Sequence, residues 1–313
     1  MAAKISKSKS AYDFDLDLEK MLYRPRVNAL LEKGLSYPMT LIWAPAGYGK
    51  TTAAMQFAKN SDCEVIFMSL SELDRNPQRF WAHISDLYKK INQDIGDAMA
   101  QIGFPFSSAQ FEQQYDIVSQ NMISRNKRLL IIDDYHLLGN PEIDKLLEKI
   151  ARLRIKNLHI YILSRVCLQN FMLDLKIKRI AMEITKEELR FDINELMEYY
   201  KTLDIDLEKA SAQDIESYTD GWASAIFLSS LYIKKDSIAD MNLDAAALDI
   251  NNLIETTIFN NYSKKTQELL LKLSILERFD IDICNYILGT NHTQKLLSNI
   301  FTNNSLIKIS EDR

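Results

Sequence analysis

The sequence predicts a parallel α/β sheet with helices on both faces, followed by an almost wholly helical second half. From about residue 38 to 185, short apolar runs alternate with amphipathic helical patterns, as in βαβ units. From about 186 to 304 the pattern is helical nearly throughout. A chain of 313 residues is longer than one hydrophobic core usually serves, so two or three domains are expected.

Short apolar segments mark the predicted strands. The run at 129–132 is apolar at every position, as expected for a parallel strand that is buried on both faces. The candidate strands cover residues 39–43, 64–68, 129–132, 158–163 and 180–184. Helices are expected between them at 51–58, 80–91, 111–123 and 143–153. In the helix at 80–91, Trp81, Ile84 and Tyr88 fall on one stripe, which is typical of a helix packed on a core.

The helical second half starts near Thr185, which has the character of an N-cap residue followed by acidic residues. Helices are predicted at 192–203, 206–217, 222–235, 246–260, 263–276, 282–288 and 293–302, followed by a short strand at 305–309. A helix cluster that ends in a strand is compatible with a winged-helix-like unit.

Composition excludes several classes of protein. The net charge of −5 argues against a chain that is mainly a DNA-binding domain. There is no run of about 18 apolar residues that would span a membrane, and the basic first ten residues are too polar for a secretory signal. The three cysteines and four histidines lack metal-ligand spacing. Free thiols in a cytoplasmic protein are therefore expected.

A glycine-rich segment follows the first predicted strand and precedes a predicted helix. It consists of Ala44, Pro45, Ala46, Gly47, Tyr48, Gly49, Lys50, Thr51 and Thr52. This fits the spacing of a phosphate-binding P-loop, with Ala44 in place of the first glycine. Gly47 and Gly49 allow backbone N–H groups to approach phosphate oxygens. Lys50 would bring a positive charge to the β- and γ-phosphates, and Thr51 would offer its hydroxyl to Mg²⁺. The sequence therefore predicts ATP binding.

Two acidic residues, Asp133 and Asp134, follow the strand at 129–132. A carboxylate at the end of a parallel strand beside the P-loop strand can hold Mg²⁺, usually through water. We assign Asp133 this role and expect Asp134 to orient the attacking water. The alternative is a pair of helix-capping acids after a core strand.

Arg165 follows Ser164 at the end of the strand predicted at 158–163. A P-loop ATPase can carry a residue there that senses the γ-phosphate, and a guanidinium would stabilise negative charge at that position. A surface arginine at a strand end is the alternative interpretation.

Seven segments occur in an order that resembles one family. They are 22–27 (LYRPRV), 44–52, 76–81 (NPQRFW), 133–136 (DDYH), 163–165 (LSR), 189–191 (LRF) and 219–222 (TDGW). Together they resemble the N-terminal part of MalT-like, LuxR-type transcriptional regulators, which are signal-transduction ATPases with numerous domains (the STAND class). The resemblance covers about residues 20–310, and TDGW departs mildly from the commoner TEGW.

The resemblance implies an architecture. We expect a flexible N-terminal arm at 1–20, a P-loop ATPase domain at 21–185, a small helical domain at 186–240 and a winged-helix-like domain at 241–313. Family members continue into an inducer-binding sensor and a DNA-binding helix-turn-helix. These two domains are expected to be absent from this chain, which ends about where the winged helix would finish. Direct DNA binding by this chain is therefore not expected.

The resemblance also implies a switch. ADP would hold a closed monomer, ATP with inducer would favour a self-associating form, and slow hydrolysis would reset the state. Arg24 is by resemblance a candidate for the adenine side of the pocket. Trp222, after Gly221, is either a packed hinge residue or a residue that touches the nucleotide. Two other functions remain open: an ATPase or phosphotransferase whose purpose is turnover, and a scaffold in which the nucleotide is structural.

Overall fold

The structure is a computed structural model that describes residues 11–12, 21–121, 127–232, 243–276, 278–289, 297 and 300. By its internal contacts the chain divides into two compact units. The first unit comprises Met1–Trp43 and Lys50–Leu189, and the second comprises Ala44–Gly49 and Arg190–Arg313. The two units are described separately below.

The first unit is built on a six-stranded parallel sheet with the strand order β1-β3-β4-β5-β2-β6. Its strands are β1 (Ala11–Tyr12), β2 (Met39–Trp43), β3 (Glu64–Ser69), β4 (Arg128–Asp133), β5 (Leu158–Ser164) and β6 (Ala181–Ile184). Every residue of β4 is buried, which explains its uninterrupted apolar run. The five predicted strands are confirmed.

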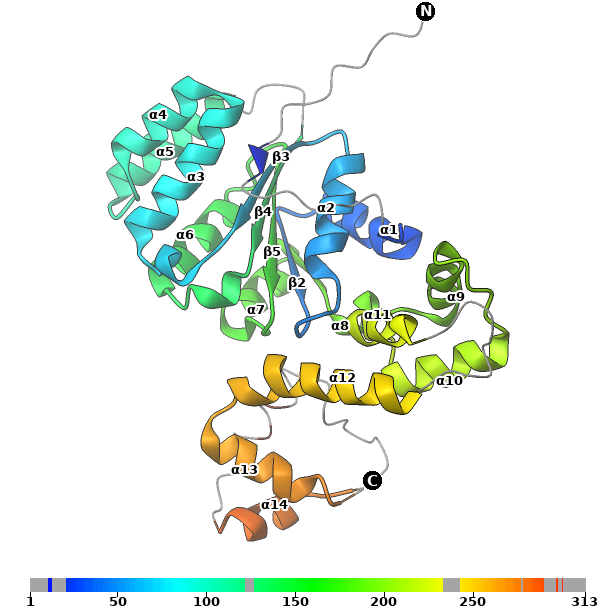
Figure 1. Ribbon diagram of the computed structural model, residues 1–313. Helices are drawn as coiled ribbons and strands as arrows, with labels where there is room; N and C mark the ends of the chain where they lie inside the picture. Colours follow the sequence, from blue (N-terminus) through cyan, green and yellow to red (C-terminus); the bar gives the residue numbers. More distant parts are fainter. Residues whose placement is uncertain are drawn as a thin grey trace, which may run out of the picture. The chain divides into compact units, whose positions relative to one another are not determined.

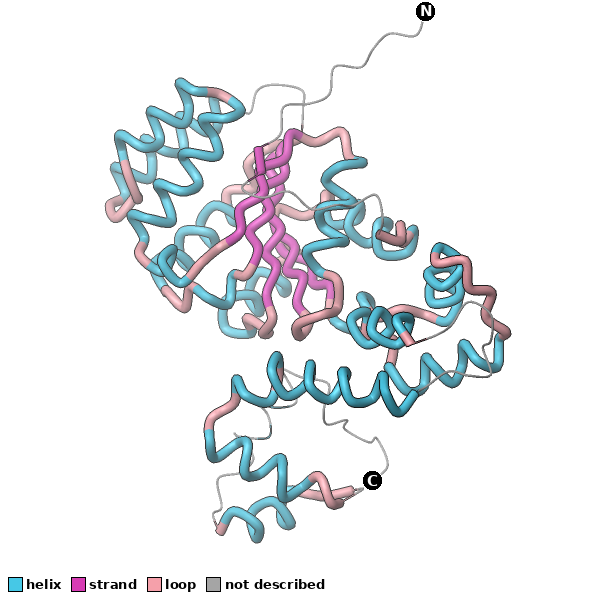
Figure 2. Tube along the Cα trace, in the orientation of Figure 1, coloured by secondary structure: helices cyan, strands magenta, loops and turns pink. Residues whose placement is uncertain are grey.

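Helices cover both faces of this sheet, as predicted, with α1 and α2 on one side and α3 to α6 on the other (Figures 1 and 2). The helices of the first unit are α1 (Pro25–Gly34), α2 (Lys50–Asn60), α3 (Pro77–Ile91), α4 (Gln93–Ile102), α5 (Ser108–Asn121), α6 (Pro141–Arg152), α7 (Gln169–Ile177) and α8 (Lys186–Leu189). The largest core lies between the sheet and α3 to α6, and Trp81, Ile84 and Tyr88 belong to it, as the apolar stripe predicts.

Polar N-cap residues determine where two helices of the first unit begin, and the apolar pattern alone does not show these positions. The helix predicted at 80–91 begins at Pro77, because the Asn76 side chain accepts a hydrogen bond from the N–H of Arg79 and proline suits the first helical position. Asn92 caps α4 in the same way. The sequence reading did not anticipate α1, α4 or α7.

Two residues of the N-terminal arm predicted at 1–20 form a strand. Within residues 1–20, Ala11 and Tyr12 form the edge strand β1 and pair with Ile66 and Phe67 of β3. The other residues of the arm lie outside the described part of the chain. A two-residue strand is too short to show a periodic pattern, so it could not be recognised from sequence.

The second unit is helical, as predicted. Its helices are α9 (Ile193–Thr202), α10 (Lys209–Thr219), α11 (Ala223–Leu231), α12 (Leu243–Thr257), α13 (Lys264–Leu273) and α14 (Ile281–Leu288). Asp192 and Glu195 form a capping box at the start of α9. Leu269, Leu273 and Cys284 form a small core with Leu297 and Ile300. Within the helix predicted at 293–302, the structure describes only Leu297 and Ile300, and both are helical. The strand predicted at 305–309 lies outside the described residues.

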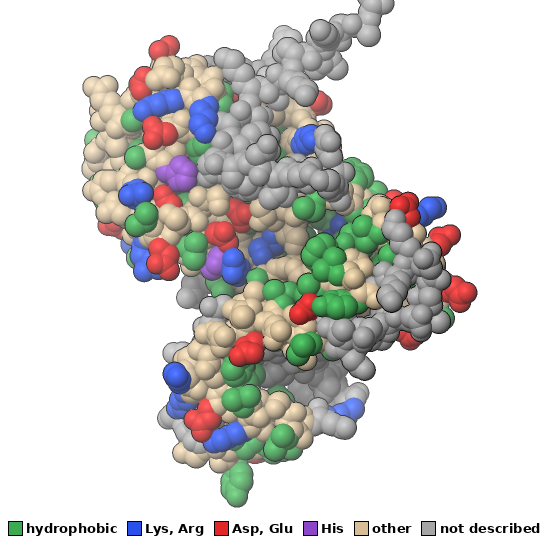
Figure 3. Space-filling view, viewed as in Figure 1, with side chains coloured by type: hydrophobic (Ala, Val, Ile, Leu, Met, Phe, Trp, Pro, Cys, Tyr) green, Lys and Arg blue, Asp and Glu red, His purple; other side chains and the backbone are tan. Residues whose placement is uncertain are grey.

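No helix in the described part of the chain has the length and apolar character needed to cross a membrane. On the face drawn in Figure 3, acidic and basic side chains are interspersed over the described residues. The division into arm, ATPase, helical and winged-helix domains remains a prediction, although the boundary between the two units, after Leu189, falls close to the predicted one at residue 185.

Candidate functional site

The glycine-rich loop joins the end of β2 to the start of α2. Gly47 and Gly49 have φ values of +81° and +77°, in the left-handed region that side chains other than glycine disfavour. A Cβ atom on Gly49 would meet no atom of the described part of the chain within 4 Å. Helix α2 begins directly after the loop, and a helix N-terminus presents unpaired N–H groups that attract anions.

Three side chains of the first unit meet at the start of α2. Thr51 Oγ1 donates a hydrogen bond of 2.5 Å to Asp133 Oδ2. Lys50 is only 8% exposed and Asp133 only 4%. Burial lowers the pKa of Lys50 to about 8, the charge of Arg165 adds to this effect, and the carboxylate of Asp133 opposes it. Burial also raises the pKa of Asp133, against the effect of its bond with Thr51. The first unit therefore holds a desolvated cation beside a buried carboxylate.

This arrangement fits a magnesium–phosphate group. Mg²⁺ prefers oxygen ligands, and the hydroxyl of Thr51 and the carboxylate of Asp133 supply two oxygens side by side. A buried ammonium group gains most from an anion, because its attraction is little screened by water. The two residues that would hold the metal are thus of the right chemistry and in contact, and the charge of Lys50, which would bind the phosphates, interacts with that of Asp133.

One expectation about the sheet is wrong. Asp133 does not lie on the strand beside the P-loop strand: β2 pairs with β5 and β6, whereas β4 pairs with β3 and β5. The carboxylate still reaches Thr51, because Thr51 lies in the first turn of α2. Of the two strands that pair with β2, β5 ends at Ser164. This residue pairs with Trp43 and precedes Arg165.

Asp134, Arg165 and His136 gather at the same edge of the sheet. Arg165 Nε lies 3.7 Å from Asp134 Oδ1, and His136 Nδ1 lies 3.9 Å from the same oxygen. Burial and the charge of Arg165 lower the pKa of His136 to about 4, so the imidazole is neutral at pH 7. The sequence alone assigns His136 no role of its own, although His136 belongs to the segment 133–136 (DDYH) that contributes to the family resemblance.

Arg24 has a structural contact in the first unit. It is 6% exposed and its Nη1 donates a hydrogen bond of 2.7 Å to the carbonyl oxygen of Leu189. Arg26 makes the equivalent bond, also 2.7 Å, to the carbonyl oxygen of Glu188. The two arginines therefore connect the start of α1 to α8 through hydrogen bonds. A role of Arg24 beside adenine remains a prediction.

The loop residues Ala44–Gly49 are grouped with the second unit, where the start of α11 contacts them. Trp222 Nε1 donates a hydrogen bond of 2.9 Å to the carbonyl oxygen of Ala46. The carbonyl oxygen of Gly47 accepts one of 3.0 Å from the N–H of Ser224 and one of 3.2 Å from its hydroxyl. A Cβ on Gly47 would lie 2.4 Å from Ser224 Oγ.

Trp222 is therefore more than a core residue. It is 7% exposed, as the packed-hinge interpretation expects, and its ring centroid lies 6.4 Å from that of Tyr48. However, its indole N–H also donates the hydrogen bond to Ala46 in the loop. Ser224 was missed altogether, because a serine in a helix has no distinctive sequence signal.

Comparisons with known proteins cover most of the chain. Residues 36–166 match a family described as an AAA domain, and residues 255–313 match the MalT winged helix domain. The HTH-type transcriptional regulator MalT of Cronobacter sakazakii is 27% identical over 297 residues, covering 90% of this chain and 32% of the relative. MalT of Klebsiella pneumoniae (strain 342) is 26% identical over 293 residues, with the same coverage. The chain spans about a third of the length of these relatives.

Two solved structures share the fold. A Walker-type ATPase of Pyrococcus abyssi superposes with a TM-score of 0.64 at 14% identity, covering 91% of each chain. A STAND protein with a tetratricopeptide repeat sensor from Pyrococcus horikoshii gives a TM-score of 0.53 at 14% identity, covering 94% of this chain and 40% of that one. At this level of identity the likeness concerns the fold alone.

The fold is that of a P-loop ATPase, with a match to the AAA domain family at residues 36–166 and to the MalT winged helix domain at residues 255–313. Along most of its length the chain is similar to the MalT transcriptional regulators, which confirms the resemblance to MalT-like regulators.

Proposed function

We propose that this chain is the nucleotide-operated switch of a MalT-like regulator. It binds ATP or ADP with Mg²⁺, hydrolyses ATP slowly, and alternates between a closed state with ADP and a self-associating state with ATP. The observation that carries the proposal is the bond of 2.5 Å between Thr51 and Asp133 beside the buried Lys50. Sensor and DNA-binding domains, where a longer protein carries them, would read the state of the switch.

The residues divide the work as follows. Backbone N–H groups of the loop and the ammonium of Lys50 bind the phosphates. Thr51 and Asp133 would hold Mg²⁺, which would supply positive charge to offset that of the phosphates. Asp134 orients water, and Arg165, whose Nε lies 3.7 Å from Asp134 Oδ1, stabilises charge on the γ-phosphate.

A switch needs contacts that differ between its two states, because a ligand shifts an equilibrium only by its differential affinity. Trp222 and Ser224 supply such contacts, since they bond to the carbonyl oxygens of Ala46 and Gly47. Any rearrangement of the loop on binding or losing the γ-phosphate changes these bonds. The start of α11 is thus the element through which the nucleotide would bias the second unit.

Hydrolysis and sedimentation rates together test the switch. We expect turnover well below about one per second, the lower end of ordinary enzyme rates. Sedimentation velocity in a non-hydrolysable ATP analogue should differ from that in ADP. Rapid turnover would instead favour an ATPase or phosphotransferase whose purpose is turnover. Bound nucleotide that never exchanges, with equal sedimentation in both nucleotides, would favour the scaffold.

Asp133→Asn is expected to lower Mg²⁺ affinity about 10- to 100-fold, the effect usual for a residue that holds a metal through water. The amide keeps the size of the side chain and loses its charge. Isothermal titration of the nucleotide-loaded protein with Mg²⁺ measures this. Asp86→Asn, at a carboxylate that is 67% exposed on α3, is the control and should behave like the wild type. Equal Mg²⁺ affinity in both variants would remove Asp133 from the metal site.

Trp222→Phe is expected to speed the release of bound nucleotide about 2- to 10-fold, because one hydrogen bond to the loop is lost while the ring remains. Stopped-flow release of a fluorescent ADP analogue measures the rate. Trp81→Phe is the matched control: its indole N–H donates a hydrogen bond of 3.0 Å to the carbonyl oxygen of Met99, remote from the loop. Identical release rates in the two variants would show that the bond to Ala46 does not restrain the loop.

A further inference from the structure

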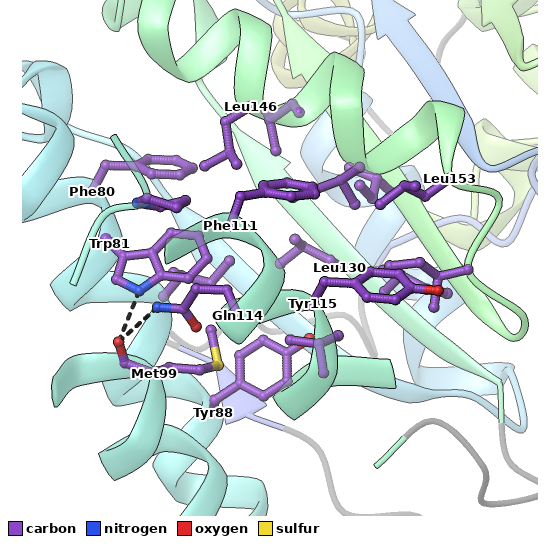
Figure 4. Close-up of a pocket in the computed structure, with 18 residues that line it drawn as sticks. Phe80, Trp81, Tyr88, Met99, Phe111, Gln114, Tyr115, Leu130, Leu146 and Leu153 are labelled. Atoms are coloured by element: carbon purple, nitrogen blue, oxygen red, sulfur yellow. Dashed lines mark hydrogen bonds between the residues drawn. The ribbon is translucent and has the colours of Figure 1, made fainter. Parts of the chain in front are cut away.

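A small apolar pocket lies in the first unit between α3, α4, α5, α6 and the sheet, apart from the nucleotide site (Figure 4). It encloses about 60 Å³, and its walls are mainly aromatic and aliphatic side chains, among them Trp81, Tyr88, Phe111 and Leu130. None of the described residues that line it is acidic or basic. The pocket therefore suits an uncharged occupant, because a charged group would be desolvated there without a partner.

One amide group breaks the apolar lining. Gln114 on α5 is 3% exposed, and its Nε2 donates hydrogen bonds of 3.0 Å to the carbonyl oxygen of Met99 and 2.9 Å to that of Gly103. Both amide hydrogens are thus used, which fixes which end of the amide is oxygen. Trp81 donates its indole N–H to the same Met99 oxygen, as the dashed lines in Figure 4 show.

The amide oxygen that remains is an unmet acceptor. Gln114 Oε1 is buried and has no hydrogen-bond partner among the described residues. Buried acceptors are nearly always satisfied in folded proteins, by protein, water or ligand. The indole N–H of Trp81, a possible donor nearby, is already committed to Met99. Within the described part of the chain, this oxygen therefore lacks a donor.

The volume of the pocket limits the size of a ligand that it can hold. A cavity of about 150 Å³ lined by apolar side chains holds benzene in another protein. The enclosed space here is about 60 Å³, so its inner part suits a body of a few heavy atoms. Tyr115 and Leu153 line the pocket and are 36% and 42% exposed, so the lining reaches the protein surface at these two residues.

We propose that this pocket binds a small neutral molecule with an apolar body and a single N–H or O–H group, which donates to Gln114 Oε1. Small heteroaromatic amines and short-chain alcohols have this chemistry. The proposal is independent of the nucleotide switch, because none of the phosphate- or metal-binding residues lines the pocket.

Pyrrole and furan are the probes, since the two rings share size and shape while only pyrrole carries a donor. Titration of the whole chain by ligand-observed saturation-transfer NMR should give an affinity for pyrrole about tenfold above that for furan. A site built to pair with a donor rejects the analogue that lacks it, because its own polar group is then left unmet. Equal affinities, or no binding of either ring, would overturn the proposal, because the pocket would then hold water or nothing.

Two variants locate the site. Gln114→Met removes the acceptor and should bring the preference for pyrrole to about one, with furan still bound. Val118→Phe, which places a ring in the lining, should abolish binding of both probes. Both variants should keep the ATP affinity of the wild type, which shows that they are folded. Persistence of the pyrrole preference in Gln114→Met, or binding by Val118→Phe, would place the probes elsewhere.

Discussion

Lys50→Met is expected to weaken the binding of ATP and ADP at least about 100-fold, since a hydrogen-bonded charge pair at a buried site is lost. Lys50 is only 8% exposed, and burial lowers its pKa to about 8. A cation held in this way is poorly solvated before the nucleotide arrives, so a phosphate gains unusually strong attraction from it. Equilibrium dialysis of nucleotide-stripped protein against labelled ATP measures the change.

The same substitution should leave the nucleotide-free protein at least as stable as the wild type, because it removes the cost of burying a charge. A thermal unfolding scan without nucleotide checks this and separates lost binding from lost folding. Lys59→Met, at an exposed position near the other end of α2, is the matched control and should bind ATP normally. Normal binding by Lys50→Met would contradict the assignment of the loop.

Gly221→Ala is expected to destabilise the second unit by about 3 kcal/mol. Gly221 has a φ of +69°, and a Cβ there would lie 2.4 Å from the backbone oxygen of Phe191. That backbone cannot yield cheaply, because the N–H of Phe191 donates a hydrogen bond of 2.8 Å to the carbonyl oxygen of Gly221. Trp222 follows directly, so the displacement should also weaken its bond to Ala46.

Calorimetric unfolding of Gly221→Ala beside Gly289→Ala separates steric conflict from backbone strain. Gly289 has a φ of +60°, but a Cβ there would meet no atom of the described residues within 4 Å. Its replacement should therefore cost only about 1 kcal/mol, the conformational cost of the left-handed region alone. Equal losses at the two positions would mean that the close approach to Phe191 has no energetic consequence.

Much of the first unit was readable because its strands are buried on both faces. A run such as Leu129, Leu130, Ile131, Ile132 has few alternatives to a central parallel strand, and all of β4 is indeed buried. The order of the strands was not readable. It depends on which helices cross which face, and β5 lies between the strand that carries Asp133 and the P-loop strand.

Some residues of the candidate site were likewise predictable from the sequence, and others were not. Lys50, Thr51 and Asp133 were predicted from local motifs, and the structure brings them together. The contacts of Trp222 and Ser224 with the loop join residues 176 and 177 positions apart, and no local pattern encodes such a pairing. No local pattern identifies Gln114 either. Its amide N–H groups bond to the carbonyl oxygens of Met99 and Gly103 because of how α4 and α5 pack, and this leaves its amide oxygen without a donor among the described residues.

A crystal structure of the chain grown with Mg²⁺ and ADP is the most direct test of the central claim. The account predicts phosphate oxygens against the backbone N–H groups of Gly47 to Thr51, the Lys50 ammonium on the phosphates, and a metal about 2.1 Å from Thr51 Oγ1. Nucleotide bound away from this loop, or an empty loop at saturating nucleotide, would contradict it.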